Sequence, residues 1–412
     1  MKSLLISSTF PPRLGGRENY VYQLFAHLPQ GEVVVLTPDR QGDWEQFDAQ
    51  SLAEKKIKII RCVPERLRWF LGKRRDRLDW VRYLARLCRR EQVRVVHCAT
   101  ALPDGLTGLL IKRALGLPYV GYVFGLEILR YEDQPWAKER MLLGLKEASC
   151  VVAISEFTKR QVVRLGIPSE RIVLVPPAVE MDAFYPDPAA GLAVRRRYGL
   201  GGKKVLLTVG RLVARKGHDR VIEALPAILR QVPDTVYLIT SDGPERERLE
   251  KLAQTVGVEQ DVIFTGPVPQ SELLSYYNAA DVFIMASRQM GSDVEGFGIV
   301  FLEASACGVP VIGGRSGGVV DAVADGESGF LVDPNDPADI AQRVVTLLQD
   351  TDLARRLGRQ GLHRVRKQFT WASAAAQIRA VNEELSATPL RRSLVQAVRF
   401  LVQRQWAAIG AR

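Results

Sequence analysis

The sequence predicts an α/β protein made of two doubly wound domains that face a central cleft. Along its 412 residues, short β-rich apolar runs alternate with stretches of helical periodicity, which predicts parallel sheets with crossover helices. The length suits two or three domains, and 47% hydrophobic with 25% charged residues is typical of a folded soluble chain. A proline-rich segment of weak periodicity, residues 175–191, separates the halves. We therefore expect an N-terminal domain over residues 1–185 and a C-terminal domain over 186–371.

The N-terminal half begins with a predicted strand, KSLLISS, and a Phe-Pro-Pro turn that leads to Gly15 and Gly16. The helix ENYVYQLFAHL follows. A glycine pair at the carboxyl end of a strand indicates either a tight turn or backbone amides that face a phosphate. The spacing differs from GxGxxG, so it predicts no dinucleotide site. Later strands are expected at VVVLT, VRVVH, PYVGYVF and VVAIS, and His97 at the end of the second is expected to be packed.

The C-terminal half opens with VLLTVG, a predicted strand that ends at Gly210 and is followed by a basic loop and an amphipathic helix. Within this loop, Arg211 can bind phosphate oxygens through two hydrogen bonds, and Lys216 can act as a mobile point charge. Both precede a helix N-terminus, whose dipole favours anions. A solvated basic loop is the alternative. Further strands are predicted at VYLIT, VIFTG, VFIMA and PVIGG.

The segment VEGFGIVFLE, residues 294–303, joins the strand VFIMA to a helix ended by Gly308. Glu295 falls in the loop at the carboxyl end of the strand, where open α/β sheets bind ligands, and Glu303 falls one turn into the helix. Carboxylates accept hydroxyl protons, and the amides of residues 298–300 can face an anion. An isolated pair of glutamates is more simply read as solvated charge. With the basic loop beside them, they predict a nucleotide-sugar site.

Several segments together resemble a family 4 glycosyltransferase of the GT-B fold, similar to the phosphatidylinositol-mannoside mannosyltransferases. The resemblance covers nearly the whole chain and implies two Rossmann-like domains, with helices of about 372–412 packing back on the first. The segments are STFPPRLGGRENYVYQLFAHL, ISEFTKRQV, VPPAVEMDAFYP, VGRLVARKG, SDGPERERLEKLA, FTGPVPQSELLSYYNAADVFIMAS, VEGFGIVFLEASACGVPVIGGRSGG and ESGFLVDPNDPADIA.

The resemblance also implies roles for individual residues. Arg211 and Lys216 would hold the donor diphosphate, Glu295 would contact the transferred sugar, and Glu303 would bind the ribose. The remaining donor contacts would be made mainly by backbone, at Gly15, Gly16, Gly266, Val268, Gly298, Ile299 and Val300. Because the nucleobase would meet backbone at residues 266–268, the sequence leaves GDP and UDP both open.

One position departs from the family pattern. Many relatives carry His-Gly-x-Glu or His-x-x-Asp after a strand of the first domain, and here the stretch is YVFGLEI with Phe124 in place of the histidine. Phenylalanine cannot hydrogen-bond a sugar hydroxyl. The substitution indicates an unusual donor contact, a mechanism that needs no histidine base, or a weakened enzyme. Glu127 is either a site residue or a favourable charge at a helix start.

The implied reaction is a retaining transfer of a hexose, of mannose or glucose type, to a lipid-linked or polysaccharide acceptor, as in cell-envelope glycan biosynthesis. The leaving phosphate would take the acceptor proton on the same face. No cofactor is expected, since the nucleotide sugar is a substrate. Because there is no D-x-D motif or histidine cluster, we also expect no metal. The alternative is a degenerate transferase that binds a sugar nucleotide or a membrane surface without turnover.

The formal charge of +11 includes a basic amphipathic stretch, residues 64–90. It predicts either peripheral contact with anionic lipid or a solvated helix packed by its apolar face. No nucleic-acid motif accompanies the charge, so no nucleic-acid partner is expected. The five cysteines are scattered and odd in number, and no apolar run reaches the roughly 18 residues of a membrane span. We expect a cytoplasmic protein, with the inner face of the plasma membrane as the site of any lipid contact.

Overall fold

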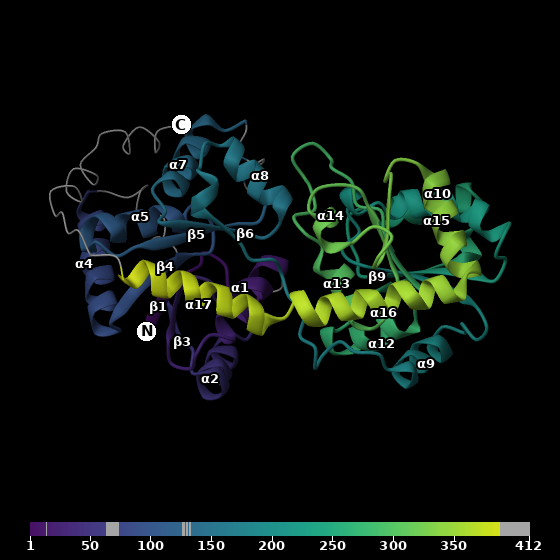
Figure 1. The fold of residues 1–412 in the computed structure, drawn as a ribbon, viewed down its shortest axis with the longest axis horizontal. Coiled ribbons are helices and arrows are strands. Elements are labelled where there is room, and N and C mark those ends of the chain that lie inside the picture. Colours follow the sequence, from purple (N-terminus) through teal and green to yellow (C-terminus); the bar gives the residue numbers. More distant parts are fainter. Residues whose placement is uncertain (14, 63–73, 126–127, 129–130, 132, 388–412) are drawn as a thin grey trace. The chain divides into compact units, whose positions relative to one another are not determined.

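The chain folds into two compact units, each with its own parallel sheet (Figure 1). The computed structural model describes the chain except residues 14, 63–73, 126–127, 129–130, 132 and 388–412, and the side chains of 74–78. Unit 1 comprises Met1–Ile154, Thr158–Val175 and the segment from Trp371, and unit 2 comprises Ser155–Phe157 and Pro176–Thr370.

Unit 1 contains a seven-stranded parallel sheet in the order β3-β2-β1-β4-β5-β6-β7. Its inner strands are almost wholly buried because helices cover both faces, which explains their continuous apolar runs. The strands are β1 (Lys2–Ile6), β2 (Val33–Thr37), β3 (Lys58–Arg61), β4 (Val93–Cys98), β5 (Tyr119–Val123), β6 (Cys150–Ala153) and β7 (Ile172–Leu174). The helices are α1 (Gly16–Ala26), α2 (Trp44–Lys55), α4 (Arg74–Arg90), α5 (Asp104–Leu115), α7 (Pro135–Lys146), most of α8 (Glu156–Arg164) and α17 (Trp371–Ala387).

Unit 2 contains a six-stranded parallel sheet in the order β10-β9-β8-β11-β12-β13. The strands are β8 (Lys204–Val209), β9 (Thr235–Thr240), β10 (Val262–Gly266), β11 (Val282–Met285), β12 (Val311–Gly314) and β13 (Gly329–Val332). The helices are α9 (Pro188–Arg197), α10 (His218–Leu229), α11 (Arg246–Thr255), α12 (Leu273–Ala279), α13 (Ile299–Ala306), α14 (Val319–Ala322), α15 (Pro337–Gln349) and α16 (Thr351–Gln368). The predicted α/β class with two doubly wound sheets is confirmed.

Local sequence explains where several helices begin. An aspartate carboxylate accepts a hydrogen bond from a backbone N–H of the first turn in four of them, which satisfies a donor that the helix itself cannot. In two of these helices a proline follows directly, at a position where its missing N–H costs nothing. The capping residues are Asp43, Asp187, Asp336 and Asp350.

The helix α17 is anchored to unit 1 by a buried histidine. His97 is fully buried in β4, and its ring nitrogens lie 3.0 Å from the Tyr122 hydroxyl and 2.8 Å from Oδ1 of Asn382 in α17. Burial lowers the pKa of His97 to about 4, so the ring is neutral. The prediction of a packed histidine is therefore confirmed.

The described part of the basic stretch 64–90 is the helix α4. Its apolar side chains Trp80, Leu84 and Leu87 are buried in the core of unit 1, and Arg82 is exposed on the other side. Residues 64–73 lie outside the described part of the chain, as does the basic segment after residue 387. None of the helices in the described residues is long and apolar enough to cross a bilayer.

Candidate active site

The predicted donor residues of unit 2 lie in loops at the carboxyl edge of its sheet. Neighbouring strands place these loops side by side, because β9, β8 and β11 are adjacent and parallel. The loop after β8 carries Arg211 and Lys216, and the loop after β11 carries Glu295. The loops after β8 and β9 also touch directly, since Leu212 N donates to Asp242 O at 3.1 Å. This edge is where ligands bind in open α/β sheets.

Glu295 is held by two cations from the loop after β8. Its Oε2 accepts from Lys216 Nζ and from an Nη atom of Arg215, each at 2.5 Å. The Nε of Arg215 also lies 2.9 Å from Oδ1 of Asp293, so this guanidinium bridges two acids of one loop. Sequence reasoning missed Arg215, because nothing in the spacing distinguishes it from the other charges of a basic loop. The fold alone brings it onto Glu295.

The buried position of this cluster explains its electrostatics. Burial alone would raise the pKa of Glu295, but the Lys216 ammonium and the Arg215 guanidinium outweigh it and bring the pKa to about 2. Burial lowers the pKa of Lys216, and Glu295 opposes that shift. Glu295 is therefore an anion at neutral pH. A carboxylate oxygen in this state can accept a hydrogen bond from a sugar hydroxyl.

Arg211 differs from its neighbours because it is exposed, and its side chain makes no hydrogen bond or ion pair with another described residue. A solvated guanidinium at the carboxyl edge of the sheet is available to a phosphate group. Gly217, which opens α10, is needed for space: a Cβ there would lie 2.0 Å from Ala286 O. The glycine thus lets the loop after β8 lie against the loop after β11.

Glu303 is a second buried carboxylate, on the first turns of α13. The Tyr277 hydroxyl donates to its Oε2 at 2.6 Å. Burial raises the pKa of Glu303 to about 7, although the bond from Tyr277 opposes the shift. The side chain can therefore change its protonation state near neutral pH. Tyr277 was not singled out from the sequence, because YYNAAD reads only as helix.

The turn that precedes α13 requires a glycine at position 298. Gly298 has φ +91°, and a Cβ there would lie 2.8 Å from the ring of Phe301. The helix begins at Ile299, and Ile299 and Val300 are half-buried. Their amides carry the partial positive charge of a helix start.

The adjacent glycines Gly317 and Gly318 support the loop that carries Glu295. Gly318 N donates to Glu295 O at 2.9 Å, and a Cβ on Gly318 would lie 1.9 Å from Gly296 O. A Cβ on Gly317 would lie 2.3 Å from Glu295 O. These contacts position the backbone of Glu295, and the sequence signal for them was the pair of glycines in GGRSGG.

Gly266 and Val268 follow β10, at the edge of the sheet. Gly266 has φ +74°, and its carbonyl accepts from Ser241 N at 2.7 Å, which ties the loop after β10 to the loop after β9. Val268 is half-buried. Both lie on the same edge as the charged cluster, two strands from β8.

The other predicted residues belong to unit 1. Gly15 and Gly16 stand at the start of α1, and Phe124 follows β5 and meets the Tyr20 ring edge-on at 5.4 Å between centroids. Glu127 lies outside the described residues. The part of the chain with described side chains contains no group of three or more metal-ligand side chains.

Comparisons with known proteins give the class of the chain. Residues 193–364 match the family Glycosyl transferases group 1, and residues 14–183 match Glycosyltransferase Family 4. The GDP-mannose-dependent alpha-(1-6)-phosphatidylinositol monomannoside mannosyltransferase of Mycolicibacterium smegmatis is 36% identical over 383 residues, which cover 91% of this chain and 96% of the relative. The protein of the same name from Mycobacterium tuberculosis strain H37Rv is 34% identical with the same coverage.

The fold agrees with these matches. The crystal structure of Anabaena Alr3699/HepE in complex with UDP superposes with a TM-score of 0.78 at 19% identity, covering 93% of this chain and all of that one. The fold and the sequence matches define a glycosyltransferase of the GT-B fold. The chain belongs to glycosyltransferase family 4.

Proposed function

We propose that this protein transfers a mannosyl group from GDP-mannose, with retention of the anomeric configuration, to a lipid-linked acceptor. The two mycobacterial relatives carry this donor and an inositol glycolipid in their names, and the identity to them extends over nine tenths of the chain. A UDP-linked hexose is the alternative donor, and a polysaccharide the alternative acceptor.

The observation that carries the proposal is the charged cluster of unit 2. Arg211 is available to bind the diphosphate, and Lys216 of the same loop contacts Glu295. The ionised Glu295 would accept hydroxyls of the sugar, and the amides at Ile299 and Val300 would face the phosphates. Glu303 would accept the ribose hydroxyls. The residues at 266–268 would meet the base.

In the proposed reaction the acceptor oxygen forms a bond to the anomeric carbon as the bond from that carbon to the phosphate oxygen breaks. The acceptor proton passes to the leaving phosphate on the same face of the sugar. Arg211 and Lys216 stabilise the charge that develops on the diphosphate, which is a larger effect in a site partly shielded from water. No step requires the histidine that Phe124 replaces, and metal independence is part of this proposal.

Incubation of the protein with GDP-mannose and a mannosyl-inositol phospholipid tests the function. We expect transfer of mannose and release of GDP that depends on the acceptor, with an α-linked product by NMR. Glu295→Gln should lower kcat by roughly 10- to 100-fold, since a charge-assisted hydrogen bond contributes about 1.5–3 kcal/mol. Release that is independent of acceptor, or equal in Glu295→Gln, would contradict the assignment.

A nonenzymatic binding protein is the rival function. It predicts tight nucleotide binding without turnover on any acceptor. The cluster of Arg211, Lys216, Glu295 and Glu303 would bind a sugar nucleotide in either case, so turnover is what separates the two functions. Assay of product with GDP- and UDP-linked mannose and glucose distinguishes the two.

A further inference from the structure

Arg288, in the loop after β11, forms a buried ion pair with Asp219 on the first turn of α10. Its two Nη atoms lie 2.9 Å and 2.7 Å from Oδ1 and Oδ2 of that carboxylate. The two side chains are only 8% and 7% exposed. A bidentate pair fixes the direction as well as the distance between its two groups. The pair therefore ties the loop after β11 to the start of α10, which directly follows the loop after β8.

Two backbone contacts beside the ion pair join the same two loops. Arg288 N donates to Arg215 O at 2.9 Å. A Cβ on Gly217 would lie 2.0 Å from Ala286 O, so the two backbones touch at this glycine. The loop after β11 thus follows the loop after β8 over several residues and does not merely cross it.

The side chains between these contacts do not hold the loops together. His218 Nε2 and Ser287 Oγ are buried and have no hydrogen-bond partner within the described part of the chain. Burial of unpaired polar groups opposes close packing. The ion pair of Asp219 with Arg288 supplies a strong polar contact at this place, and it offsets the cost of bringing the loops so close.

The tied loops carry the charged cluster of unit 2. Arg215 and Lys216 come from the loop after β8, and both donate to Oε2 of Glu295 in the loop after β11. Asp293 of the same loop lies 2.9 Å from Nε of Arg215. These contacts between long side chains require the two loops to lie at one distance and in one register.

The segment from Arg288 to Glu295 is short and folded on itself. Met290 and Asp293 exchange two backbone hydrogen bonds, of 2.8 Å and 3.0 Å. Gly291 between them has φ +59°, in the left-handed region that favours glycine. A displacement of Arg288 would therefore be passed to Glu295 by a compact turn, because there is no slack loop to absorb it.

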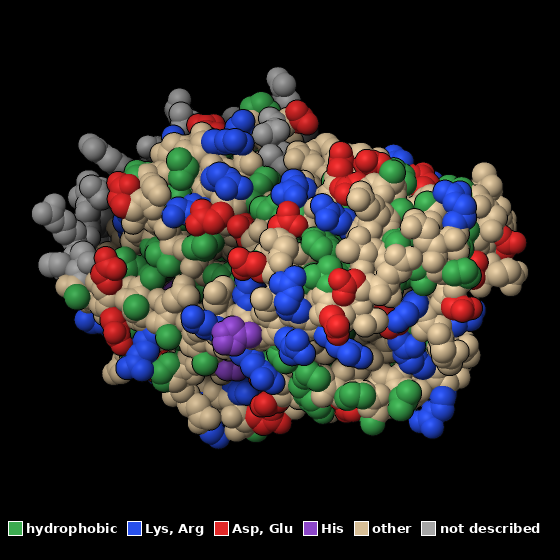
Figure 2. Space-filling model, turned by 45° about the vertical axis from the view of Figure 1, so that its right-hand side comes forward, with side chains coloured by type: hydrophobic (Ala, Val, Ile, Leu, Met, Phe, Trp, Pro, Cys, Tyr) green, Lys and Arg blue, Asp and Glu red, His purple; other side chains and the backbone are tan. Residues whose placement is uncertain are grey.

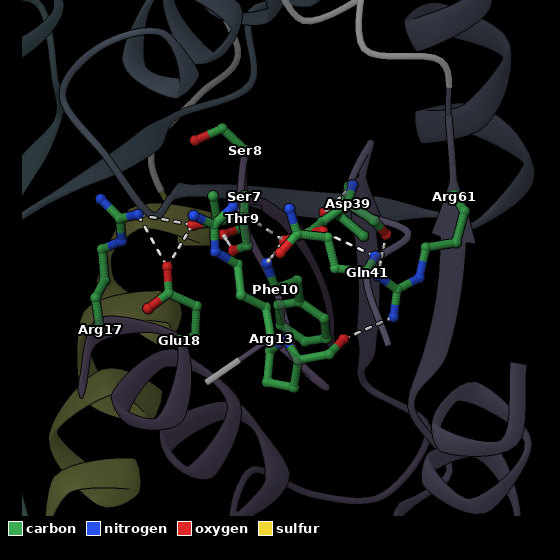
Figure 3. A network of polar contacts seen from close by, with 12 residues as sticks. Ser7, Ser8, Thr9, Phe10, Arg13, Arg17, Glu18, Asp39, Gln41 and Arg61 are labelled. Carbon is green, nitrogen blue, oxygen red and sulfur yellow. Dashed lines mark hydrogen bonds and ion pairs between the residues drawn. The ribbon is translucent and has the colours of Figure 1, made fainter. Parts of the chain in front are cut away.

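Unit 1 holds its own loops with a comparable buried arginine (Figure 3). Arg61, at the end of β3, has a side chain that is 3% exposed and forms a bidentate ion pair with Asp48 of α2. It also donates to Pro11 O at 2.7 Å and to Asp39 O, in the loops after β1 and β2. A buried arginine thus ties loops at the carboxyl edge of each sheet.

We propose that the ion pair of Arg288 with Asp219 positions Glu295 in the donor site. Both members are positioning residues, because they act through the loops and need no contact with the substrate. Without the pair, the loop after β11 would shift from the loop after β8, and the contact of Glu295 with Lys216 would lengthen. The inference rests on the proposed function only in assuming that Glu295 serves the transfer.

The titration of Glu295, followed by NMR on the full chain with 13C-labelled glutamate carboxyl groups, tests the positioning without turnover. Comparison with Glu295→Gln assigns the signal. In the wild type, Lys216 and Arg215 bring the pKa of Glu295 to about 2 against the effect of burial. We expect Arg288→Met to raise this pKa by roughly one unit, so that about a tenth of Glu295 is protonated at pH 4 and not about a hundredth.

Arg248→Met is the matched control. Arg248 lies on α11, and its Nη2 is 3.2 Å from Oδ2 of Asp219. Asp219 therefore loses one cation in either variant, but only Arg288→Met cuts the tie to the loop after β11. Arg248→Met should leave the titration of Glu295 unchanged. An equal shift in both variants, or no shift in Arg288→Met, would overturn the inference.

Asp219→Asn separates positioning from the direct effect of charge. Removing a negative charge by itself stabilises the ionised form of Glu295 and lowers its pKa. Loss of the ion pair should instead raise the pKa, as in Arg288→Met. Because both substitutions break one contact, the double variant should shift the titration no further than either single variant does. A lowered pKa in Asp219→Asn would contradict the inference.

Arg61→Met controls for the loss of a buried, bidentate arginine. Chemical denaturation should show a loss of stability similar to that of Arg288→Met, whereas the Glu295 signal should stay as in the wild type. A shift of that signal in Arg61→Met would mean that general destabilisation moves it, and the inference would fail. If Arg288→Met does not fold, Asp219→Asn alone decides, through the sign of its shift.

Transfer of mannose provides the second readout. Arg288→Met and Asp219→Asn should lower kcat by roughly tenfold and change the KM for GDP-mannose much less, since Arg211 is left in place to bind the diphosphate. Arg248→Met should keep the wild-type kcat. A wild-type kcat in Arg288→Met contradicts the inference. If the wild type transfers mannose to no acceptor, the proposed function fails, whereas the titration still decides whether the ion pair positions Glu295.

Discussion

At the scale of single residues, Lys216 has two competing partners. In this structure it pairs with Glu295, and in the proposed donor complex it would also meet the diphosphate. Arg215 contacts the same carboxylate oxygen and is anchored by Asp293. Arg215 can therefore keep Glu295 ionised and in place while Lys216 shifts toward phosphate.

Substitution of Arg215 should alter the pH dependence of the reaction. The depressed pKa of Glu295 belongs to an acid whose charged form is favoured, so losing Arg215 raises that pKa toward its usual range. We expect Arg215→Met to move the acidic limb of kcat to higher pH and to lower kcat at neutral pH by roughly tenfold. Arg215→Lys should fall between, because an ammonium cannot bridge both acids as the guanidinium does.

The control is Arg355→Met, which removes an arginine that is 73% exposed on α16. Its pH profile should match that of the wild type. If the acidic limb of the kcat–pH profile of Arg215→Met coincided with that of the wild type, Arg215 would have no role in keeping Glu295 ionised.

Glu303 should make nucleotide binding depend on pH. Its pKa of about 7 lies above the ordinary value, so the folded protein holds a proton that the unfolded chain releases. This group therefore costs stability progressively as pH rises from about 4.5 to 7. If ribose hydroxyls bind the ionised form, GDP affinity should rise roughly tenfold between pH 6 and 8.

Calorimetry of GDP with the wild type and Glu303→Gln measures this dependence. The titration of GDP itself, and that of Asp104, whose pKa burial raises to about 7, are common to both proteins and cancel in the comparison. If the ratio of the GDP affinity of the wild type to that of Glu303→Gln stayed constant from pH 6 to 8, the proposal that Glu303 binds the ribose would be wrong.

Sequence analysis could identify site residues whose side chains are charged and which follow a predicted strand. Lys216 and Glu295 were singled out because each follows an apolar strand, and the structure brings them into contact. Arg215 and Tyr277 were not reached, because their partners Glu295 and Glu303 are distant in the sequence. The sequence of a basic loop does not show which of its cations will contact an acid in the folded protein.

At the scale of elements, the glycine pair before α14 supports the loop of Glu295. Gly318→Ala would place a methyl group 1.9 Å from Gly296 O, so either loop must move. We expect a loss of stability of about 1–3 kcal/mol and weaker donor binding. Gly201→Ala is the control, because a Cβ there meets nothing within 4 Å. Chemical denaturation and GDP calorimetry measure both effects, and equal behaviour of the two variants would contradict this role.

Three strands escaped prediction for a shared physical reason. The strands β3, β7 and β13 each lie at an edge of a sheet. These three strands are only three or four residues long and partly exposed, so their apolar residues stand out less from the flanking segments than those of strands buried on both faces. The inner strands were all predicted, because burial on both faces gives them a continuous apolar run. Sequence therefore predicted the centre of each sheet better than its rim.

The helix α4 limits the way in which residues 64–90 can contact lipid. Since Trp80, Leu84 and Leu87 are buried in the core, the exposed side chains on the described part of this helix are charged: Asp79 and the arginines at 82, 86, 89 and 90. We expect binding to phosphatidylserine vesicles that disappears in 1 M salt, where charges are screened within about 3 Å. The triple variant with Glu at positions 82, 86 and 89 should bind roughly 100-fold more weakly, as each arginine contributes about 1 kcal/mol.

A charge-matched variant of α16, with Glu in place of Arg355, Arg356 and Arg359, controls for net charge. Its vesicle binding in a sedimentation assay should exceed that of the α4 variant. Binding that persists in 1 M salt would show that apolar side chains enter the bilayer, and equal binding of the two variants would remove α4 from the contact.

At the scale of the whole molecule, the net charge of +11 comes from two segments: residues 64–90 carry +7, from ten Lys and Arg against three acids, and residues 388–412 carry +5, from five Arg. On the face shown in Figure 2, Lys and Arg side chains are interspersed with Asp and Glu. Many cations are paired with acids, as in the bidentate contact of buried Arg288 with Asp219. The charge total is therefore a weak guide to partners, and the local clusters carry the functional information.

The fold of the whole chain was predictable because two independent patterns agree. Alternation of apolar strands and helices predicts a doubly wound sheet, and its recurrence in each half predicts two. Each unit has its own sheet and core. Donor and acceptor identity were not predictable in this way, since the residues at 266–268 proposed to meet the base would do so mainly through backbone, and no sequence pattern marks the acceptor.

Titration of the full chain with GDP and UDP, compared with Arg211→Ala, tests the central claim most directly. The account predicts that one nucleoside diphosphate binds and that Arg211→Ala weakens it by roughly 10- to 100-fold, because a charge-assisted contact to phosphate is lost. Arg355→Met should bind as the wild type does. Binding of neither nucleotide, or affinity that is the same in Arg211→Ala, would contradict a donor site in the loops of unit 2.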